Sequence, residues 1–193
     1  MAGFKRVPTA KIADDKKNAV FLAIYAKEIS PWKYFQDEYA KHIKCPAVIM
    51  IDRWDGRSGF PGGTLNDGET LMEALKREIK EEIGIHIRED KIFGVSSFDY
   101  KLRTHLFAME VIEMEFMHIY YHILNNFSRS ILLHAYKEGD DSHFMSEITG
   151  IKIVPIIDIK GKGIKNFLQN NFAGATKEDL KIFLSEILDF KYT

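Results

Sequence analysis

Residues 63–85 read GTLNDGETLMEALKREIKEEIGI, a run with helical periodicity between two glycine-containing stretches. At 100° per residue, Glu78, Glu81 and Glu82 fall within an arc of about 100° on one side of such a helix. The neighbouring arc carries the apolar side chains of Met72, Leu75, Ile79 and Ile83. One stripe would therefore face the core and the other a cleft.

We expect this helix to run from about Thr70 to Ile83 and to end at Gly84, because glycine readily adopts the left-handed conformation that follows many helices. Like charges three and four residues apart each destabilise a helix by roughly 0.2 to 0.5 kcal/mol. A bound cation would neutralise the three carboxylates, and hard oxygen ligands select Mg²⁺ or Mn²⁺. The segment therefore predicts a divalent metal site.

Composition limits the class of protein and the kinds of partner. The 193 residues fit a single domain over residues 1–193, and 27 Lys and Arg balance 28 Asp and Glu. This balance argues against a surface that coats nucleic acid, so we expect no DNA partner and at most a local patch for RNA. Cys45 is the only cysteine, which excludes a disulfide within the chain and favours a reducing, intracellular compartment. The apolar run Ala19–Ala26 is too short to cross a membrane, and we expect no membrane partner.

Other elements follow from periodicity and turn residues. Short apolar runs rich in β-branched and aromatic residues predict strands, the 54–63 segment WDGRSGFPGG predicts a loop, and helical spacing after Glu113 predicts an amphipathic helix. Thr176 should open a final helix, with Asp179 as its partner in a capping box. The expected strands are Ala19–Ala26, Ala47–Asp52, Ile92–Asp99, Leu102–Ile112 and Ile151–Ile157, and the amphipathic helix should span about Glu113–Asn125.

The 63–85 segment resembles the Nudix box, G-x5-E-x7-R-E-U-x-E-E-x-G-U, in which U is an aliphatic residue. Every fixed position is filled, by Gly63, Glu69, Arg77, Glu78, Ile79, Glu81, Glu82, Gly84 and Ile85. The resemblance implies an α/β fold, an α/β/α sandwich around a mixed sheet, in which the box holds metal against a diphosphate. It also implies hydrolysis of a nucleoside diphosphate linked to another group, with two or more Mg²⁺ or Mn²⁺ ions. Metal ions suit this reaction because they neutralise pyrophosphate oxygens and activate water.

The resemblance assigns roles within and beside the box. Glu78 and Glu82 would be the chief metal ligands, the Gly62 carbonyl another, and Glu81 a further ligand or the base that orients water. Glu69 and Arg77 would brace the loop, with Gly63 and Gly84 as structural positions of the box. The catalytic base of Nudix enzymes often lies outside the box. Glu147, just before a predicted strand, is our candidate, with an ordinary exposed loop glutamate as the alternative.

Two further stretches, Arg53–Gly63 (RWDGRSGFPGG) and Phe167–Leu180 (FLQNNFAGATKEDL), resemble the Nudix hydrolases that decap small nucleolar RNA and also cleave inosine and xanthosine diphosphates. The matched positions imply substrate contacts by Arg53, Arg57, Phe60, Asn170 and Gly174. For Phe60 the alternative is plain loop packing.

The chain departs from that subgroup at Phe21, where the subgroup has a histidine, and at Asp179, where it has a glutamine. An acidic side chain can accept from the N1–H and amino group of guanine, and an aromatic ring can stack on a methylated, cationic base. The pair would therefore fit recognition of an RNA cap. Structural roles, in a buried strand and at a helix start, are the alternative for both residues.

Three functions remain open from the sequence. The leading hypothesis is metal-dependent decapping of RNA, releasing 7-methylguanosine diphosphate and RNA with a 5′-monophosphate, in the nucleus, including the nucleolus, or the cytoplasm. The second is a housecleaning hydrolase of inosine or xanthosine di- or triphosphates, which would use the same metal ligands. The third is a non-catalytic binding protein on the Nudix scaffold. The subgroup resemblance also implies a homodimer. His118 and His122 have the spacing of a zinc pair but lack an obvious third ligand.

Overall fold

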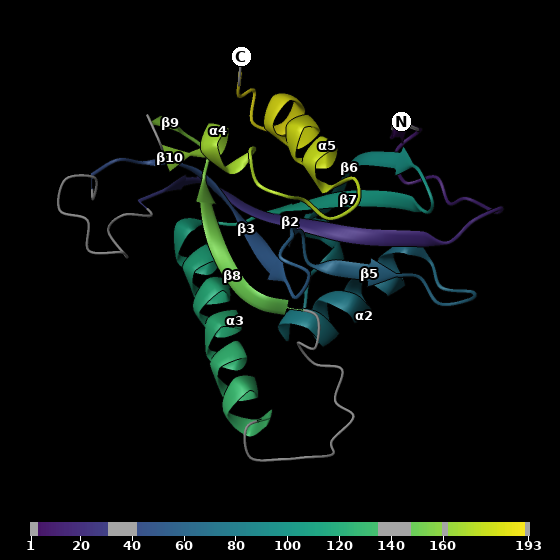
Figure 1. Cartoon of the computed structure of the whole chain (residues 1–193), viewed down its shortest axis with the longest axis horizontal. Coiled ribbons are helices and arrows are strands. Elements are labelled where there is room, and N and C mark those ends of the chain that lie inside the picture. Colours follow the sequence, from purple (N-terminus) through teal and green to yellow (C-terminus); the bar gives the residue numbers. More distant parts are fainter. Residues whose placement is uncertain (1–3, 31–41, 135–147, 160–161, 192–193) are drawn as a thin grey trace.

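The computed structural model describes residues 4–30, 42–134, 148–159 and 162–191 (Figure 1). Its strands are β1 (Lys5–Arg6), β2 (Asn18–Ile29), β3 (Cys45–Arg53), β4 (Ser58–Gly59), β5 (Gly62–Thr64), β6 (Ile92–Asp99), β7 (Arg103–Glu110), β8 (Ile148–Pro155), β9 (Asp158–Ile159) and β10 (Lys162–Gly163). Its helices are α2 (Leu71–Ile83), α3 (Glu113–His134), α4 (Ile164–Phe167) and α5 (Thr176–Ile182), with a 3₁₀ turn at Glu89–Lys91 and a π-helical turn, η2, at Phe183–Ile187.

A mixed sheet forms the middle layer. Its strands lie in the order β1-β6-β7-β2-β3-β4, with β8 paired to β3 and β5 paired to β2. Strands β2 and β7 are parallel, and the other pairs of this sheet are antiparallel. One edge of β2 is shared, because β3 pairs with it from Tyr25 onward and β5 pairs with it at Ala19–Phe21. The chain between β4 and β5 therefore lies beside β2, next to the part of β2 that pairs with β3.

Helices cover both faces of the sheet. Helices α2 and α3 lie on one face and α4 and α5 on the other (Figure 1). The first core contains Ile24, Ile49 and Leu75, and the second contains Val48, Leu180 and Phe183, all of them fully buried. Alternation along β2 and β3 explains the division, since successive side chains of a strand point to opposite faces. The expected α/β/α sandwich around a mixed sheet is confirmed.

Several expectations about individual elements need correction. The 54–63 segment is not all loop: Ser58 and Gly59 pair with Asp52 and Ile51, and Gly62 begins β5. Backbone groups near a sheet need hydrogen-bond partners, and the edges of β2 and β3 supply them. Helix α3 continues to His134, beyond the expected end near Asn125.

The capping box expected at Thr176 is also wrong. Thr176 is the first helical residue of α5, and Ala175 holds the cap position without a side-chain hydrogen bond. The side chain of Asp179 is buried and accepts from Ser96 instead. In the described ranges no helix is long and apolar enough to cross a membrane.

Candidate active site

Helix α2 is fixed at both ends and along one face. The Thr70 hydroxyl accepts from the Glu73 backbone N–H, and the Glu73 carboxylate accepts from the Thr70 backbone N–H, which completes a capping box. Gly84 ends the helix with φ 72° and donates to the Lys80 carbonyl, as expected. The buried face consists of Leu71, Ala74, Leu75, Ile79 and Ile83. Glu78, Glu81 and Glu82 lie on the arc next to this buried stripe.

Arg77 ties the acidic cluster to the loop before the helix. Its guanidinium forms a two-pronged ion pair with Glu69, at 2.7 Å from Nε and 2.8 Å from Nη2, and Nη2 also donates to the Thr64 carbonyl at 2.9 Å. Nη1 donates to Glu78 at 2.8 Å and to Glu81 at 3.1 Å. Hydrogen bonds from Arg77 and from the Asn66 backbone lower the pKa of Glu69 to about 2. Glu69 therefore stays ionised and keeps Arg77 in place.

Two glycines bring the chain of β5 against the glutamates. A Cβ on Gly63 would clash with the Glu78 carboxylate, and a Cβ on Gly62 would clash with the Val20 carbonyl of β2. The Gly62 N–H donates to Glu82 Oε2 at 2.6 Å. Glu78 is largely buried, and burial raises the pKa of its carboxyl while the neighbouring Arg77 lowers it.

The donor chemistry of Glu78, Glu81 and Glu82 fits a hard divalent cation, because all three supply carboxylate oxygens from one side of α2. In the arrangement seen here, two of them contact Arg77 and the third contacts Gly62. Across the described ranges, no three His, Cys, Asp or Glu side chains are grouped so that they could hold a metal ion. The metal-ligand roles of the box therefore remain a proposal.

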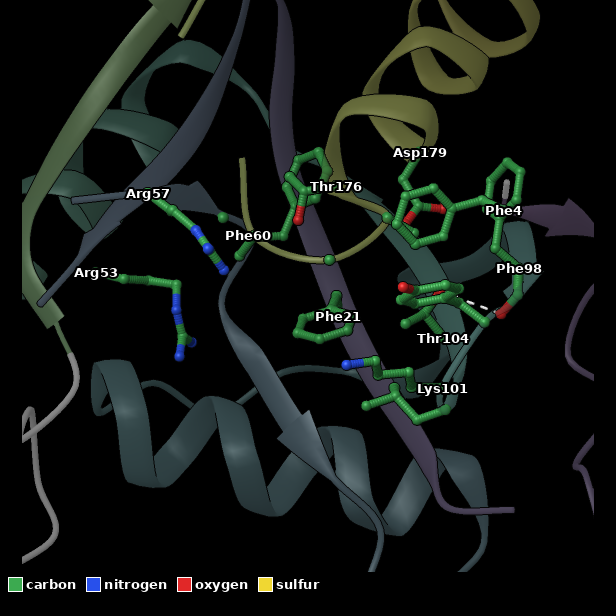
Figure 2. A pocket seen from close by; sticks show the side chains of 16 residues that line it. Phe4, Phe21, Arg53, Arg57, Phe60, Phe98, Lys101, Thr104, Thr176 and Asp179 are labelled. Carbon is green, nitrogen blue, oxygen red and sulfur yellow. Dashed lines mark hydrogen bonds between the residues drawn. The ribbon is translucent and has the colours of Figure 1, made fainter. Parts of the chain in front are cut away.

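A cavity of about 400 Å³ lies between the sheet and the C-terminal segment (Figure 2). In Figure 2, Arg53 and Arg57 lie at one end, Asp179 and Phe4 lie at the other, and Phe21 and Phe60 lie between them. The lining comprises Phe4, Phe21, Arg53, Arg57, Gly59, Phe60, Phe98, Tyr100, Lys101, Leu102, Thr104, Ala173, Gly174, Ala175, Thr176 and Asp179.

Backbone hydrogen bonds between residues close in sequence position Arg53 and Arg57 at one end of this cavity. The Arg53 N–H donates to the Arg57 carbonyl, and Gly56, with φ 75°, closes the turn by donating to the Arg53 carbonyl. Asp55 lies 3.8 Å from Arg53 and 3.9 Å from Arg57. A tight hairpin therefore presents two cations side by side.

The C-terminal loop reaches the cavity through the same hairpin. Ser58 donates to the Asn171 carbonyl and accepts from the Ala173 backbone N–H, so residues 171–173 lie along β4. This pairing brings Gly174 and the start of α5 over the cavity. The positions of this loop and of the arginine hairpin are thus coupled.

The structure brings most of the predicted substrate-binding residues together. Six of them line the cavity, namely Phe21, Arg53, Arg57, Phe60, Gly174 and Asp179. Phe60 is also packed into the second core, with 2 % of its surface exposed, so both readings of this residue apply. Asn170 lies exposed in the turn after α4 and does not line the cavity. Glu147 lies outside the described residues.

Sequence reasoning missed the far wall of the cavity. Phe4 directly precedes β1, and Phe98, Tyr100, Lys101 and Thr104 come from β6, β7 and the turn between them. The Phe4 and Tyr100 rings pack at a centroid distance of 5.1 Å. No local pattern marks these residues, because β1 reaches the site by pairing with a strand about 90 residues away.

The histidine pair on α3 lies elsewhere. His118 and His122 line a second hollow of about 310 Å³ that also contains His86 and Glu115. His122 Nε2 lies 3.2 Å from the Gly84 carbonyl and 2.9 Å from the Asn126 amide. These side chains form no metal-holding group within the part of the chain that the structure describes.

Comparison with known proteins identifies the family. A family model described as "Nudt16-like: U8 snoRNA-decapping enzyme-like" matches residues 18–188. The chain belongs to this Nudt16-like family. It is 31 % identical over 193 residues to the U8 snoRNA-decapping enzyme of Mus musculus, an alignment that covers 97 % of this chain and 91 % of the mouse enzyme. The corresponding enzyme of Xenopus laevis is 29 % identical over 143 residues, which covers 69 % of this chain and 60 % of that enzyme.

Solved structures agree on the fold of the Nudt16-like chain. A MutT/nudix family protein from Enterococcus faecalis superposes with a TM-score of 0.53 at 11 % identity, covering 93 % of this chain and 64 % of that one. At this identity the likeness shows the fold alone. The resemblance to Nudix hydrolases read from residues 63–85 is confirmed, and so is the narrower subgroup.

Proposed function

We propose that this Nudt16-like protein hydrolyses the phosphoanhydride linkage of capped RNA, releasing 7-methylguanosine diphosphate and RNA with a 5′-monophosphate. The observation that carries the proposal is the set of three glutamates on α2, two of them bound by Arg77, in a chain that also has a cavity of nucleotide size. Family membership supports the choice of substrate, because a relative from Mus musculus named U8 snoRNA-decapping enzyme shares 31 % identity over nearly the whole chain.

Within this proposal, Glu78, Glu81, Glu82 and the Gly62 carbonyl would hold Mg²⁺ or Mn²⁺, with two or more ions. When bound, such ions neutralise the pyrophosphate oxygens and lower the pKa of a coordinated water. Arg77 and Glu69 position the cluster through their own ion pair. Arg53 and Arg57 lie at the end of the cavity where they would bind phosphate, and the Phe21 and Phe60 rings would hold the base.

The catalytic base remains a separate proposal. Glu147 lies outside the described residues, and it stays our candidate on its position before β8. A Glu147→Gln variant should slow turnover without changing the KM for capped RNA. Unchanged turnover would return Glu147 to an ordinary surface role.

Partners and location follow from the proposed substrate. We propose a homodimer, as the family resemblance implies, and a location in the nucleus, including the nucleolus, or in the cytoplasm, where capped RNA is found. Sedimentation equilibrium would measure the mass in solution. Imaging of a fluorescent fusion would report the compartment.

A second candidate is hydrolysis of free inosine or xanthosine di- or triphosphates. The size of the cavity supports this second candidate, because about 400 Å³ suits one nucleotide. No residue that lines the cavity requires an RNA chain. A side-by-side turnover assay with capped RNA, inosine diphosphate and xanthosine diphosphate, under Mg²⁺ and under Mn²⁺, ranks the substrates. The highest kcat/KM on capped RNA supports decapping, and the highest on a free nucleotide favours the second candidate. Turnover of none of them would favour a non-catalytic binding protein.

A further inference from the structure

Asp179 is an unusual side chain for the wall of a cavity. It lies in the first turn of α5 with 2 % of its surface exposed, and it lines the cavity described above. Ser96 Oγ donates to its Oδ1 at 2.5 Å. Among the described residues, no other donor contacts the carboxylate, which leaves Oδ2 without a protein partner. A buried carboxylate with a spare acceptor atom faces a ligand-sized space.

The surroundings of Asp179 do not stabilise its charge. The pKa of its carboxyl is raised to about 7, chiefly by burial and also by the nearby Glu178, although the Ser96 hydrogen bond acts to lower it. No ion pair joins Asp179 to a cation within the described ranges, although Arg53, Arg57 and Lys101 line the same cavity. An uncompensated buried carboxylate lowers stability, so a structural role does not account for it.

The rest of the cavity sets the direction in which a nucleotide would lie. Arg53 and Arg57 lie at the end away from Asp179, with the Phe21 and Phe60 rings between (Figure 2). Phosphate at the arginine end would place a base among aromatic rings, with its edge at Asp179. The carboxylate oxygens of Asp179 would then accept hydrogen bonds from donors on that edge of the base.

We propose that Asp179 is a specificity-determining residue that selects guanine by accepting from its N1–H and its 2-amino group. The inference rests on the proposed function, in which the cap supplies a guanine base. Guanine presents two adjacent donors on this edge, hypoxanthine presents only N1–H, and adenine presents an acceptor at N1. A base with only N1–H forms one hydrogen bond fewer with the carboxylate, and a base with neither donor leaves Oδ2 without a partner.

Binding of nucleoside monophosphates tests the proposal, because they contain no phosphoanhydride bond to cleave. Affinities of the full chain in Mg²⁺ would be measured by calorimetry for guanosine, inosine, xanthosine and adenosine monophosphates. Guanosine monophosphate should bind roughly tenfold or more tightly than inosine monophosphate, and adenosine monophosphate should bind more weakly still. Equal affinities for guanosine and inosine monophosphates would overturn the proposal.

Asp179→Asn supplies the complementary test. An asparagine keeps one acceptor for N1–H and gains an amide donor, which suits the 2-oxo group of xanthine rather than the 2-amino group of guanine. The variant should therefore prefer xanthosine monophosphate. Glu178→Gln is the matched control, since it neutralises the neighbouring acid outside the cavity and should keep the wild-type order. An Asp179→Asn variant that still prefers guanosine monophosphate would contradict the assignment.

The two proposals fail separately. Guanine selection with no turnover of capped RNA would refute decapping and leave Asp179 as the base reader. Turnover of capped RNA with no discrimination among the monophosphates would refute the role of Asp179 alone. If Asp179→Asn does not fold, the wild-type affinities remain decisive.

Discussion

Arg77 explains how Glu78 and Glu81 can lie close together on α2 before any metal binds. One guanidinium contacts Glu69, Glu78 and Glu81, and the Thr64 carbonyl takes a further donor. The pKa of Arg77 is raised by these acids, chiefly by Glu69, so its charge is permanent. The repulsion expected between Glu78 and Glu81 is therefore relieved within the protein itself.

Glu82 offers the cleanest test of the catalytic cluster. Glu82→Gln keeps the size of the side chain and an oxygen for the Gly62 N–H, but it removes a charge from the proposed metal site. We expect kcat on capped RNA to fall more than about 100-fold, with little change in Tm. Glu89→Gln is the control, because Glu89 is exposed and pairs only with Lys76 among the described residues. Wild-type turnover by Glu82→Gln would refute the assignment.

The residues whose positions on α2 the sequence predicted share one property: the pattern that predicts them lies within a short stretch of chain. Glu78, Glu82 and Gly84 follow from a single helical repeat and its terminator. Asp179 was identified as a departure from the subgroup, but its contact with Ser96 joins residues 83 positions apart. No periodicity predicts such a contact.

At the scale of elements, β5 and α2 act as one unit. β5 supplies Gly63 to the helix, and the absence of a side chain there makes room for the Glu78 carboxylate. The structure fixes this approach by pairing Gly63 with Val20 of β2. The spacing between Gly63 and Glu78 in the box therefore fits the contact between β5 and α2, in addition to the proposed metal ligands.

Gly63→Ala separates these two roles. The clash falls on the flexible end of Glu78, so the fold should tolerate the methyl group by moving that carboxylate. We expect Tm to change by only a few degrees while kcat falls roughly tenfold or more. Gly150→Ala in β8 is the control, because its added methyl group makes only ordinary contacts with Asp52. A fully active Gly63→Ala variant would show that the position of Glu78 is unimportant.

The N-terminal strand β1 is one of the elements that the sequence did not predict. Lys5 and Arg6 pair with β6, and Arg6 forms a two-pronged ion pair with Glu186, at 2.7 and 2.9 Å. The family match begins at residue 18, so this strand lies outside it. Strand pairing between distant residues leaves no local pattern, which is why Phe4 was missed as part of the cavity wall.

Phe4→Ala tests whether the segment that leads into β1 contacts the substrate. Phe4 is 38 % exposed and packs against Tyr100 at the cavity, so its loss should affect the fold little. Base stacking on an aromatic ring contributes about 1 to 3 kcal/mol, and a partial contact at the rim should give a several-fold weaker affinity for guanosine monophosphate. Phe93→Ala, another exposed aromatic of the same sheet outside the cavity, is the control. Equal affinities in both variants would limit β1 to a structural role.

In the molecule as a whole, two buried titratable groups, His105 and Asp179, change stability in opposite directions as pH changes. His105 is fully buried between Ser97 and Asn18, and burial lowers its pKa to about 4. As pH falls from 6.5 to 4, the unfolded chain gains a proton that the folded protein does not, so stability is lost. Asp179 acts in the other direction. As pH falls from about 7 toward 3.8, its folded form gains the proton first, and stability is gained.

Between pH 4 and 6.5 these two contributions should nearly cancel, since each changes the free energy of unfolding by about 1.4 kcal/mol per pH unit. Asp179→Asn removes one of them, so its stability relative to wild type should grow as pH rises from 4 to 7 and then level off. Urea unfolding at half-unit steps from pH 4.5 to 8 measures this difference, and Glu89→Gln, an exposed acid outside the cavity, should follow the wild-type profile. A pH-independent difference would mean that Asp179 keeps one charge state over this range. A rising difference, together with the predicted change of base preference, would show that the fold tolerates a destabilising buried acid at the position that reads the base.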